Sequence, residues 1–435
     1  MESKEQENFV VSPCKCACEI EKQQKQQDME NKEVENSEVG PCGIGKQQNQ
    51  QDMENKELEM FEVGPCESPY QMGFLIGKRF SDTIRSRLEK DMVLREQLVP
   101  FAQTPESKPL IESLCKNNKA KYPTHWDELM GIVDGSEAPA LEIILLNFRR
   151  EILPFIQDEA SIVDCTDDCS DLLIVSDSLA LAAHNEDASF GLSGYTYLIK
   201  GKLQNGICYI AYTHAGEIPS RAFSFNSNGL AFTMNTVRPV NDEIDPGAIG
   251  RNFISRDLLE STSFEDAIAR IRSAEISLGH NYNVIDIQTR RIASVETASK
   301  YRLSVHEVGA TPFFHANMYS HLQTVKQIID ENSTSRKKRA DVMSKESKDD
   351  FLSVIGDTDN KEYPIYMKGK YKDDLYCLVL SKLNSKIFLM SSGPKLYTMC
   401  SVLIDLDEEM LSIFQGNPKN KEITHVFSLS ELKKP

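Results

Sequence analysis

Two short apolar runs, residues 172–175 and 179–183, constrain the fold of this chain most. Each has the length of a buried strand, and the polar pair between them is typical of a hairpin turn. Because a hairpin brings the outer ends of its strands together, Cys169 is expected near Asn185 and Asp187 at one edge of a sheet. A thiol beside an amide and a carboxylate is a candidate nucleophile site.

The overall charge limits the partners that the chain can bind. It has 435 residues, with 66 acidic and 49 basic side chains and a formal net charge of −17. This balance argues against nucleic acid as a partner and offers no basic patch for anionic membranes. The length is sufficient for a sizeable core, about two domains at roughly 100–200 residues each.

The cysteine usage indicates a reducing compartment. The chain has 11 cysteines, an odd and irregularly spaced set that fits poorly with a disulfide framework. The first residues lack the apolar core of a signal peptide, and no apolar run approaches the roughly 18–20 residues of a membrane span. We therefore predict a cytoplasmic protein with reduced thiols and no membrane partner.

The N-terminal region has the composition of a disordered tail. Residues 1–61 are rich in Gln, Glu, Lys and Asn and lack the apolar content that would offset the entropy of ordering. Residues 22–42 recur as residues 46–66, an offset of 46−22 = 24, which indicates a local duplication. The alternate cysteines of residues 14–18 invite a metal interpretation, but their spacing is not that of a zinc site, so free thiols are the preferred interpretation.

The rest of the chain alternates between helical and strand periodicity. Helices are predicted at residues 68–88, 109–118, 141–152, 249–259 and 264–272. Strands are predicted at residues 195–199, 207–213, 222–226, 229–234, 283–287 and 292–295. Asn228-Gly229 between two of them predicts a hairpin turn. Blocks of helices and strands in this order predict an α+β layered fold.

A family resemblance rests on Cys-Ser-Asp at residues 169–171 and His-Asn-Glu-Asp at residues 184–187, with the two apolar runs between them. This pattern resembles the isopenicillin-N acyltransferase family, which includes the insect β-alanyl-dopamine hydrolase and plant relatives. Similar motifs occur at residues 363–366 and 393–398. The resemblance implies an N-terminal-nucleophile (Ntn) hydrolase with a four-layer αββα sandwich, and a turn at residues 128–132.

In this family a precursor cuts itself before an internal cysteine, which implies cleavage between Asp168 and Cys169. The implied organisation is a helical first chain at residues 62–168 and a catalytic second chain at residues 169–435. The two chains are expected to stay together as a heterodimer. Residues 369–391 have no counterpart in the family pattern and indicate a surface excursion or a gene-model artefact.

Cleavage would give Cys169 a free α-amino group close to its own sulfur. An α-amine has a pKa of about 7.7–8.0 and a free thiol about 8.5, so the amine can take the thiol proton without a histidine. One alternative is that Cys169 is a small buried side chain, and another is Cys165 as the nucleophile. Only Cys169 has an Asn 185−169 = 16 positions further on, the spacing of the penicillin-pathway enzyme. Family members have Gly before the nucleophile, so Asp168 is a departure that bears on self-cleavage.

The resemblance also implies roles for other side chains. Asn317, in the motif His-Ala-Asn, would donate a hydrogen bond to the oxyanion, and Asp187 would orient the new amino terminus. Each has the alternative of an ordinary turn residue. Residues expected to support the substrate or the structure are Asn185, Ser170, His214 and Asn235. No metal site and no cofactor are expected, although acyl-coenzyme A could serve as a co-substrate.

We therefore predict a self-processing amide hydrolase or N-acyltransferase that acts on small N-acyl or β-alanyl amines through an acyl-enzyme on Cys169. One alternative is an acyl-coenzyme-A-dependent N-acyltransferase, which would consume a thioester only when an amine is added. Another alternative, from a different class, is an uncleaved pseudoenzyme that serves as a binding protein.

Overall fold

The computed structural model describes residues 58–156, 167–219, 221–368 and 396–433. Residues 1–57 of the predicted disordered tail, which contain the cysteine cluster and most of the duplication, lie outside these residues. Cys165 and the atypical segment 369–391 also lie outside them. The prediction of disorder is wrong for residues 60 and 61, which begin a β-strand.

Two β-sheets form the centre of the described chain. The larger sheet contains β1 (Met60–Val63), β4 (Thr196–Lys202), β5 (Cys208–His214), β6 (Phe223–Asn226), β7 (Leu230–Thr236), β8 (His280–Asp286), β9 (Arg291–Ala298) and β10 (Arg302–Glu307). The smaller sheet contains β2 (Asp168–Val175), β3 (Ala180–Ala188), β11 (Phe313–His315), β12 (Tyr397–Asp405), β13 (Met410–Phe414) and β14 (His425–Ser428). The strand orders are β1-β4-β5-β6-β7-β8-β9-β10 and β11-β2-β3-β12-β13-β14. β1 runs parallel to β4, and β2 runs antiparallel to β3.

Helices cover the outer faces of the two sheets. Before β2 come α3 (Pro69–Arg79), α4 (Ser81–Lys90), α5 (Val99–Ala102), α6 (Lys108–Lys121), α7 (Pro123–Ser136), α8 (Ala140–Asn147) and α9 (Arg149–Ile152). Later in the chain are α10 (Arg251–Leu258), α11 (Phe264–Arg272), α12 (Glu331–Asp341), α13 (Lys348–Ile355) and α15 (Leu429–Leu432). Within the described ranges, no helix has the length and apolar character that crossing a bilayer requires.

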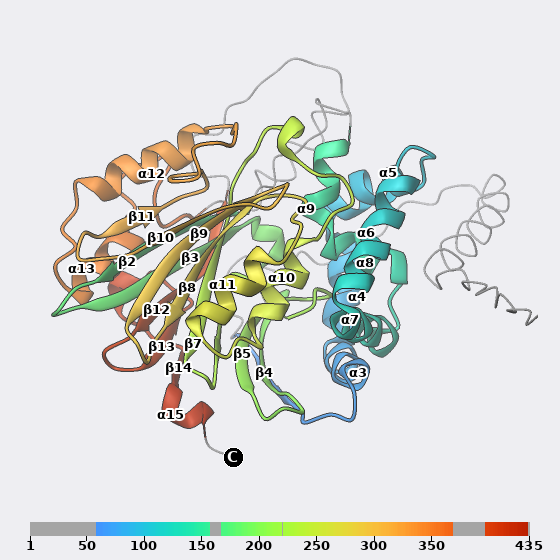
Figure 1. Cartoon of the computed structure of the whole chain (residues 1–435), viewed down its shortest axis with the longest axis horizontal. Helices are drawn as coiled ribbons and strands as arrows, with labels where there is room; N and C mark the ends of the chain where they lie inside the picture. Colours follow the sequence, from blue (N-terminus) through green and yellow to red (C-terminus); the bar gives the residue numbers. More distant parts are fainter. Residues whose placement is uncertain (1–57, 157–166, 220, 369–395, 434–435) are drawn as a thin grey trace, which may run out of the picture.

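Three hydrophobic clusters show how the layers stack. One cluster joins the N-terminal helices, α10 and α11 to the larger sheet and includes Ile76 and Tyr282. A second lies between the two sheets and includes Leu173 and Ile210. A third joins Phe351 of α13 to the smaller sheet. Figure 1 shows α12 and α13 on one side of the sheets and the N-terminal helices on the other. This order confirms the predicted α+β fold and its four-layer αββα sandwich.

The strands predicted after the first hairpin are confirmed. Each of the six predicted runs coincides with one of the observed strands β4 to β9. Gly229 occupies the predicted turn between β6 and β7, where its φ of 83° is a conformation that glycine adopts without strain.

Two predicted helices are each interrupted by an aromatic residue. Residues 68–88 divide into α3 and α4 at Phe80, and residues 141–152 divide into α8 and α9 at Phe148. The ring of Phe80 stacks on Tyr197 of the larger sheet at a centroid distance of 3.6 Å, and Phe148 is fully buried. Periodicity places these rings on the buried face, but it does not show that the backbone turns to pack them.

The predicted turn at residues 128–132 is wrong, because these residues lie in the middle of α7. Gly131, which lies among these residues, allows α7 to pack closely against α3. A Cβ on Gly73 would lie 1.9 Å from the carbonyl oxygen of Glu128, and a Cβ on Gly131 would lie 2.1 Å from that of Tyr70. The two helix backbones therefore touch at positions where only glycine fits.

Replacing Gly73 with Ala is expected to destabilise the fold by about 1–3 kcal/mol, because the added methyl forces α3 and α7 apart. This cost exceeds the roughly 1 kcal/mol that Ala gains over Gly within a helix. Urea unfolding followed by circular dichroism measures the change. Gly309→Ala is the control, since its added Cβ meets nothing within 4 Å. Equal stability of the two variants would contradict the close contact.

Candidate active site

The pairing of β2 with β3 determines which side chains meet. Cys169 lies directly opposite Glu186, and Ser170 lies opposite Asn185. Because successive side chains of a strand point to opposite faces, the Cys169 thiol shares one face with Glu186. Ser170, Asn185 and Asp187 share the other face. Cys169 therefore lies beside Asn185 and Asp187 along the ladder, as expected, but the side chains of these two residues point to the other face of the sheet. The two strands also lie inside the six-stranded sheet rather than at its edge.

The face that carries Cys169 looks into the space between the sheets. Asp171, two residues further along β2, accepts a hydrogen bond from Thr233 Oγ1 of β7 at 2.6 Å and so links the two sheets. The opposite face is covered by α12, from which Arg336 donates to Ser170 Oγ at 2.9 Å. The nucleophile predicted from the sequence thus lies in the central layer of the sandwich.

Cys169 is buried, with only 3% of its surface exposed. Its thiol donates to Glu186 Oε2 at 3.5 Å, and its backbone N–H donates to Asn317 Oδ1 at 3.0 Å. Burial raises the pKa of the Cys169 thiol well above its ordinary value, and the carboxylates of Glu186 and Asp187 raise it further. In the continuous chain the thiol is therefore protonated and a weak nucleophile.

Arg336 connects residues on both sides of the peptide bond between Asp168 and Cys169. It is fully buried in α12 and donates through Nη1 to the carbonyl oxygen of Cys169 at 2.6 Å. Its Nη2 donates to Asn317 Oδ1 at 2.7 Å and to the carboxylate of Asp168 at 3.3 Å. No motif surrounds Arg336 in the sequence, and its distance of 167 residues from Cys169 hides the contact.

Asp168, which departs from the family pattern, is buried among side chains that donate hydrogen bonds to its carboxylate. Only 1% of its surface is exposed. Its carboxylate pairs with Arg238 and accepts hydrogen bonds from Asn332 Nδ2 at 2.7 Å and from Arg336. A buried charge needs such partners, because its desolvation would otherwise cost several kcal/mol. The side chain before the predicted cleavage point is therefore fixed.

Asp187 and Asn185 make separate contacts on the helix-facing side. Asp187 Oδ1 accepts a hydrogen bond from Thr398 Oγ1 at 2.5 Å. Burial raises the pKa of Asp187 to about 7, although Arg336 and Thr398 oppose this shift. Asn185 donates to the carbonyl oxygen of Ile355 at 2.7 Å. The amide of Asn185 thus supports the packing of α13.

Asn317 is held in a loop that Glu296 ties to the larger sheet. Its Nδ2 donates to the carbonyl oxygen of Thr236 at 3.0 Å. The Glu296 carboxylate accepts four hydrogen bonds, from His315 Nε2 and from the backbone N–H groups of Ser320, His321 and Leu322. Burial would raise the pKa of Glu296, but the hydrogen bond from His315, the charges of His315 and His321 and the backbone N–H of Ser320 together outweigh burial, and the pKa falls to about 2. The motif His-Ala-Asn marks the loop in the sequence, but no motif marks Glu296 itself.

Asn235 and His214 face the same space from the larger sheet. Asn235 Oδ1 accepts from Asn281 Nδ2 at 3.2 Å, while its buried Nδ2 has no hydrogen-bond partner among the described residues. His214 is fully buried, and its Nε2 lies 3.4 Å from Glu186 Oε1. Burial lowers the pKa of His214, so the imidazole is neutral.

Cys169 and two neighbouring side chains could together hold a metal ion. Cys169, His184 and Glu186 each offer a ligand atom, and these atoms lie within 4.8 Å of one another. His184 Nδ1 bonds to Asp171 Oδ1 at 3.0 Å, the kind of contact that orients metal-binding histidines. This donor set suits zinc, which would occupy the thiol that the predicted chemistry needs. The absence of a metal site stays a prediction.

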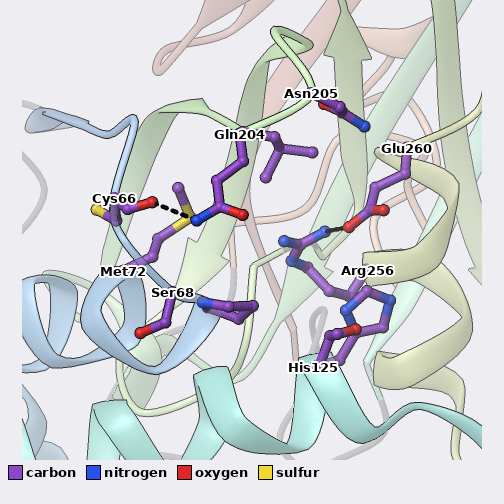
Figure 2. Close-up of a pocket in the computed structure, with 11 residues that line it drawn as sticks. Cys66, Ser68, Met72, His125, Gln204, Asn205, Arg256 and Glu260 are labelled. Atoms are coloured by element: carbon purple, nitrogen blue, oxygen red, sulfur yellow. Dashed lines mark hydrogen bonds and ion pairs between the residues drawn. The ribbon is translucent and has the colours of Figure 1, made fainter.

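A separate cavity of about 230 Å³ lies beside α3, α7, α10 and the connection between β4 and β5 (Figure 2). Arg256 Nη1 donates to Glu260 Oε1 at 3.1 Å on one side of it. On the other side Gln204 Nε2 donates to the carbonyl oxygen of Cys66 at 3.0 Å. Cys169 is not among its lining residues, so this cavity is not part of the nucleophile site.

Comparison with known proteins gives the family. Residues 175–395, just over half of the chain, match the model of the acyl-coenzyme A:6-aminopenicillanic acid acyl-transferase family. The chain belongs to this family, which confirms the resemblance found in its motifs.

Two relatives match most of the chain. The beta-alanyl-dopamine/carcinine hydrolase of Drosophila melanogaster is 22% identical over 378 residues, which cover 81% of this chain and 92% of the relative. The 40 kDa form of the acyl-coenzyme A:6-aminopenicillanic-acid-acyltransferase of Emericella nidulans is 22% identical over 343 residues, which cover 75% of this chain and 85% of the relative. The structure of a Caenorhabditis elegans N-acylethanolamine-hydrolyzing acid amidase ortholog is 10% identical, with a TM-score of 0.35, and covers 55% of this chain and 93% of that one. That last likeness is too weak to add to the other two.

Replacing Glu296 with Gln is expected to destabilise the protein by about 2–3 kcal/mol at pH 7, because it removes a charge that accepts buried hydrogen bonds. The pKa of Glu296 is about 2 in the folded chain and about 4.3 in an unfolded one. Its contribution is therefore complete above about pH 4.3 and is lost as the pH falls towards 2.

Urea unfolding of the wild type and Glu296→Gln between pH 7 and pH 3 tests this expectation. The stability difference should be constant down to about pH 4.5 and should then shrink. Glu265→Gln is the matched control, because that carboxylate is exposed and solvent screens its ion pair with Arg291. A difference for Glu296→Gln that does not depend on pH would contradict the assignment.

Proposed function

We propose that this protein is a self-processing Ntn enzyme that hydrolyses or transfers the acyl groups of small amides through Cys169. The position of Cys169 carries the proposal. It is the second residue of β2, its thiol lies between the sheets, and Asn317 holds its backbone N–H at 3.0 Å. Membership of an acyl-transferase family supports the same reading.

The proposed maturation exposes the amino group of Cys169. The sulfur attacks the carbonyl carbon of Asp168, a thioester replaces the peptide bond, and water hydrolyses the thioester. The new α-amine then takes the thiol proton for each attack on a substrate. Asp187 pairs with Asp168, the residue just before the new amino terminus. We propose that its carboxylate orients the amine.

Two amide side chains support a proposed oxyanion site. Asn317 contacts the backbone of Cys169, although one hydrogen of its Nδ2 already goes to Thr236. Asn235 has a buried Nδ2 that is unpaired among the described residues, and it lies on β7 between Thr233 and Thr236. Preorganised amide donors of this kind stabilise a tetrahedral intermediate. We therefore propose that Asn235 donates alongside Asn317.

The two processed chains are expected to stay associated as a heterodimer. β1 of the first chain pairs with β4 of the second, with Met60 opposite Leu198. The helices of the first chain pack on the larger sheet in one continuous hydrophobic cluster. Separation would expose that cluster to water, which opposes dissociation.

The recombinant chain is expected to separate under denaturing conditions into two fragments that meet at Asp168 and Cys169. Intact-mass spectrometry checks this directly. Cys169→Ala should stay whole, because it lacks the sulfur. Cys115→Ala, a matched change at a buried cysteine of α6, should be cleaved like the wild type. A wild type that stays whole would contradict self-processing and favour an uncleaved binding protein.

We also propose that the substrates are small N-acyl or β-alanyl amines, since one relative is a beta-alanyl-dopamine/carcinine hydrolase. The cleaved protein is expected to release amine from such compounds, and Cys169→Ala should lose at least about 10³-fold of the activity. Liquid chromatography of the products measures both. Consumption of acyl-coenzyme A that requires an added amine would instead identify a transferase. The Emericella nidulans relative has the name of such an acyltransferase. Activity equal to that of Cys169→Ala on all these compounds would contradict the proposal.

A further inference from the structure

The proposed maturation leaves its first proton transfer without a base. In the cleaved enzyme the α-amine of Cys169 takes the thiol proton, but in the continuous chain that nitrogen is an amide. It donates its hydrogen to Asn317 Oδ1 and has no basic lone pair to offer. The thiol donates a hydrogen bond to Glu186 Oε2, so its proton is still on the sulfur. Another group must therefore accept its proton before the sulfur can attack Asp168.

Glu186 is the side chain that the thiol contacts. The Cys169 thiol donates to Glu186 Oε2 at 3.5 Å, a hydrogen bond between direct register partners of β2 and β3. Only 2% of Glu186 is exposed, so water does not compete strongly for this contact. A base has to lie within hydrogen-bond reach of the proton that it takes, and the Glu186 carboxylate meets this condition.

The other oxygen of Glu186 lies near charged and ring groups of the larger-sheet side of the site. Oε1 lies 3.4 Å from His214 Nε2 of β5 and 3.7 Å from Arg221 Nε. Arg221 is itself fixed, since its Nη1 donates to Glu217 Oε2 at 2.9 Å. Oε1 makes no hydrogen bond among the described residues, and Oε2 is the oxygen that faces the thiol.

The nearest competing base is His184. One of its ring nitrogens lies within 4.8 Å of the Cys169 sulfur, and its Nδ1 is bound to Asp171. No hydrogen bond joins His184 to the thiol among those of the described residues, and its Nε2 is 4.0 Å from Glu186 Oε2. Of the two groups, only the Glu186 carboxylate makes a hydrogen bond with the thiol among the described residues.

We infer that Glu186 is the catalytic base of self-cleavage, the step that precedes the proposed enzymatic activity. This inference rests on the proposed function. Glu186 takes the proton from the Cys169 thiol, and the sulfur forms a bond to the carbonyl carbon of Asp168. The protonated Glu186 then returns the proton to the nitrogen of Cys169 as the carbon–nitrogen bond breaks. A thioester and a free amine result, and water hydrolyses the thioester to the carboxyl group of Asp168.

The test follows cleavage of newly made protein by intact-mass spectrometry after cell-free synthesis. Glu186→Gln keeps the shape of the side chain but cannot take the proton, so cleavage should be at least about 10²-fold slower than in the wild type. Glu128→Gln is the matched control, because Glu128 is a buried carboxylate paired with Arg256 at 2.8 Å in another part of the protein. It should be cleaved at the wild-type rate.

His184→Gln separates the two bases. Cleavage that survives this change within about 10-fold supports Glu186, whereas loss of cleavage in His184→Gln together with normal cleavage in Glu186→Gln overturns the inference. Wild-type cleavage by Glu186→Gln alone also overturns it. If the wild type itself is not cleaved, the proposed function fails instead, so the two failures are distinguishable.

A folding defect is checked by comparing circular dichroism and thermal midpoint with Cys169→Ala, the uncleaved reference. Should Glu186→Gln not fold, Glu186→Asp replaces it, since this variant keeps the carboxylate but withdraws it by one methylene. A folded Glu186→Asp should be cleaved at least about 10-fold more slowly than the wild type, because the carboxylate loses contact with the thiol. Cleavage at the wild-type rate would overturn the role of Glu186.

Discussion

The backbone ladder between β2 and β3 is the constraint on which the rest of the site depends. It sets Cys169 opposite Glu186 and Asp171 opposite His184. Since side chains alternate along a strand, this register sends the thiol between the sheets and Ser170 towards the helices. A shift by one residue would exchange the two faces and place the thiol under α12. The chemistry proposed for the chain is therefore a consequence of strand register.

The same ladder divides the space between the sheets into an apolar and a polar part. Towards the hairpin turn it is filled by residues such as Leu173 and Ala182. Towards Cys169 it holds ionisable groups, and buried charges are tolerated only when they are paired. Asp167 illustrates this: burial would raise the pKa of its carboxyl, but Arg221, Arg150 and Arg251 together hold that pKa well below its usual range. The first part contributes to stability, and the second contains the groups of the proposed chemistry.

Local patterns in the sequence predicted much of the fold, because strand and helix periodicity depend on neighbouring residues. The first hairpin, the strands β4 to β9 and the turn at Gly229 were all predicted in this way. The breaks at Phe80 and Phe148 were not predicted, since each depends on packing against a distant part of the core. Of the site, Cys169 and Asn317 were found through motifs, and the hydrogen bond that joins them agrees with a shared role. Glu186 could have been found, because counting back from the hairpin turn pairs it with Cys169.

The sequence by itself determined the nucleophile candidate, the αββα order of elements and the family. These depend on short motifs and on apolar periodicity, which a chain carries without being folded. Only the tertiary structure decided what surrounds the thiol. Arg336 reaches Cys169 across 167 residues, and Glu296 fixes Asn317 by accepting backbone N–H groups. Such contacts exist only when the layers are assembled, because burial and register, and not proximity in sequence, bring these side chains together.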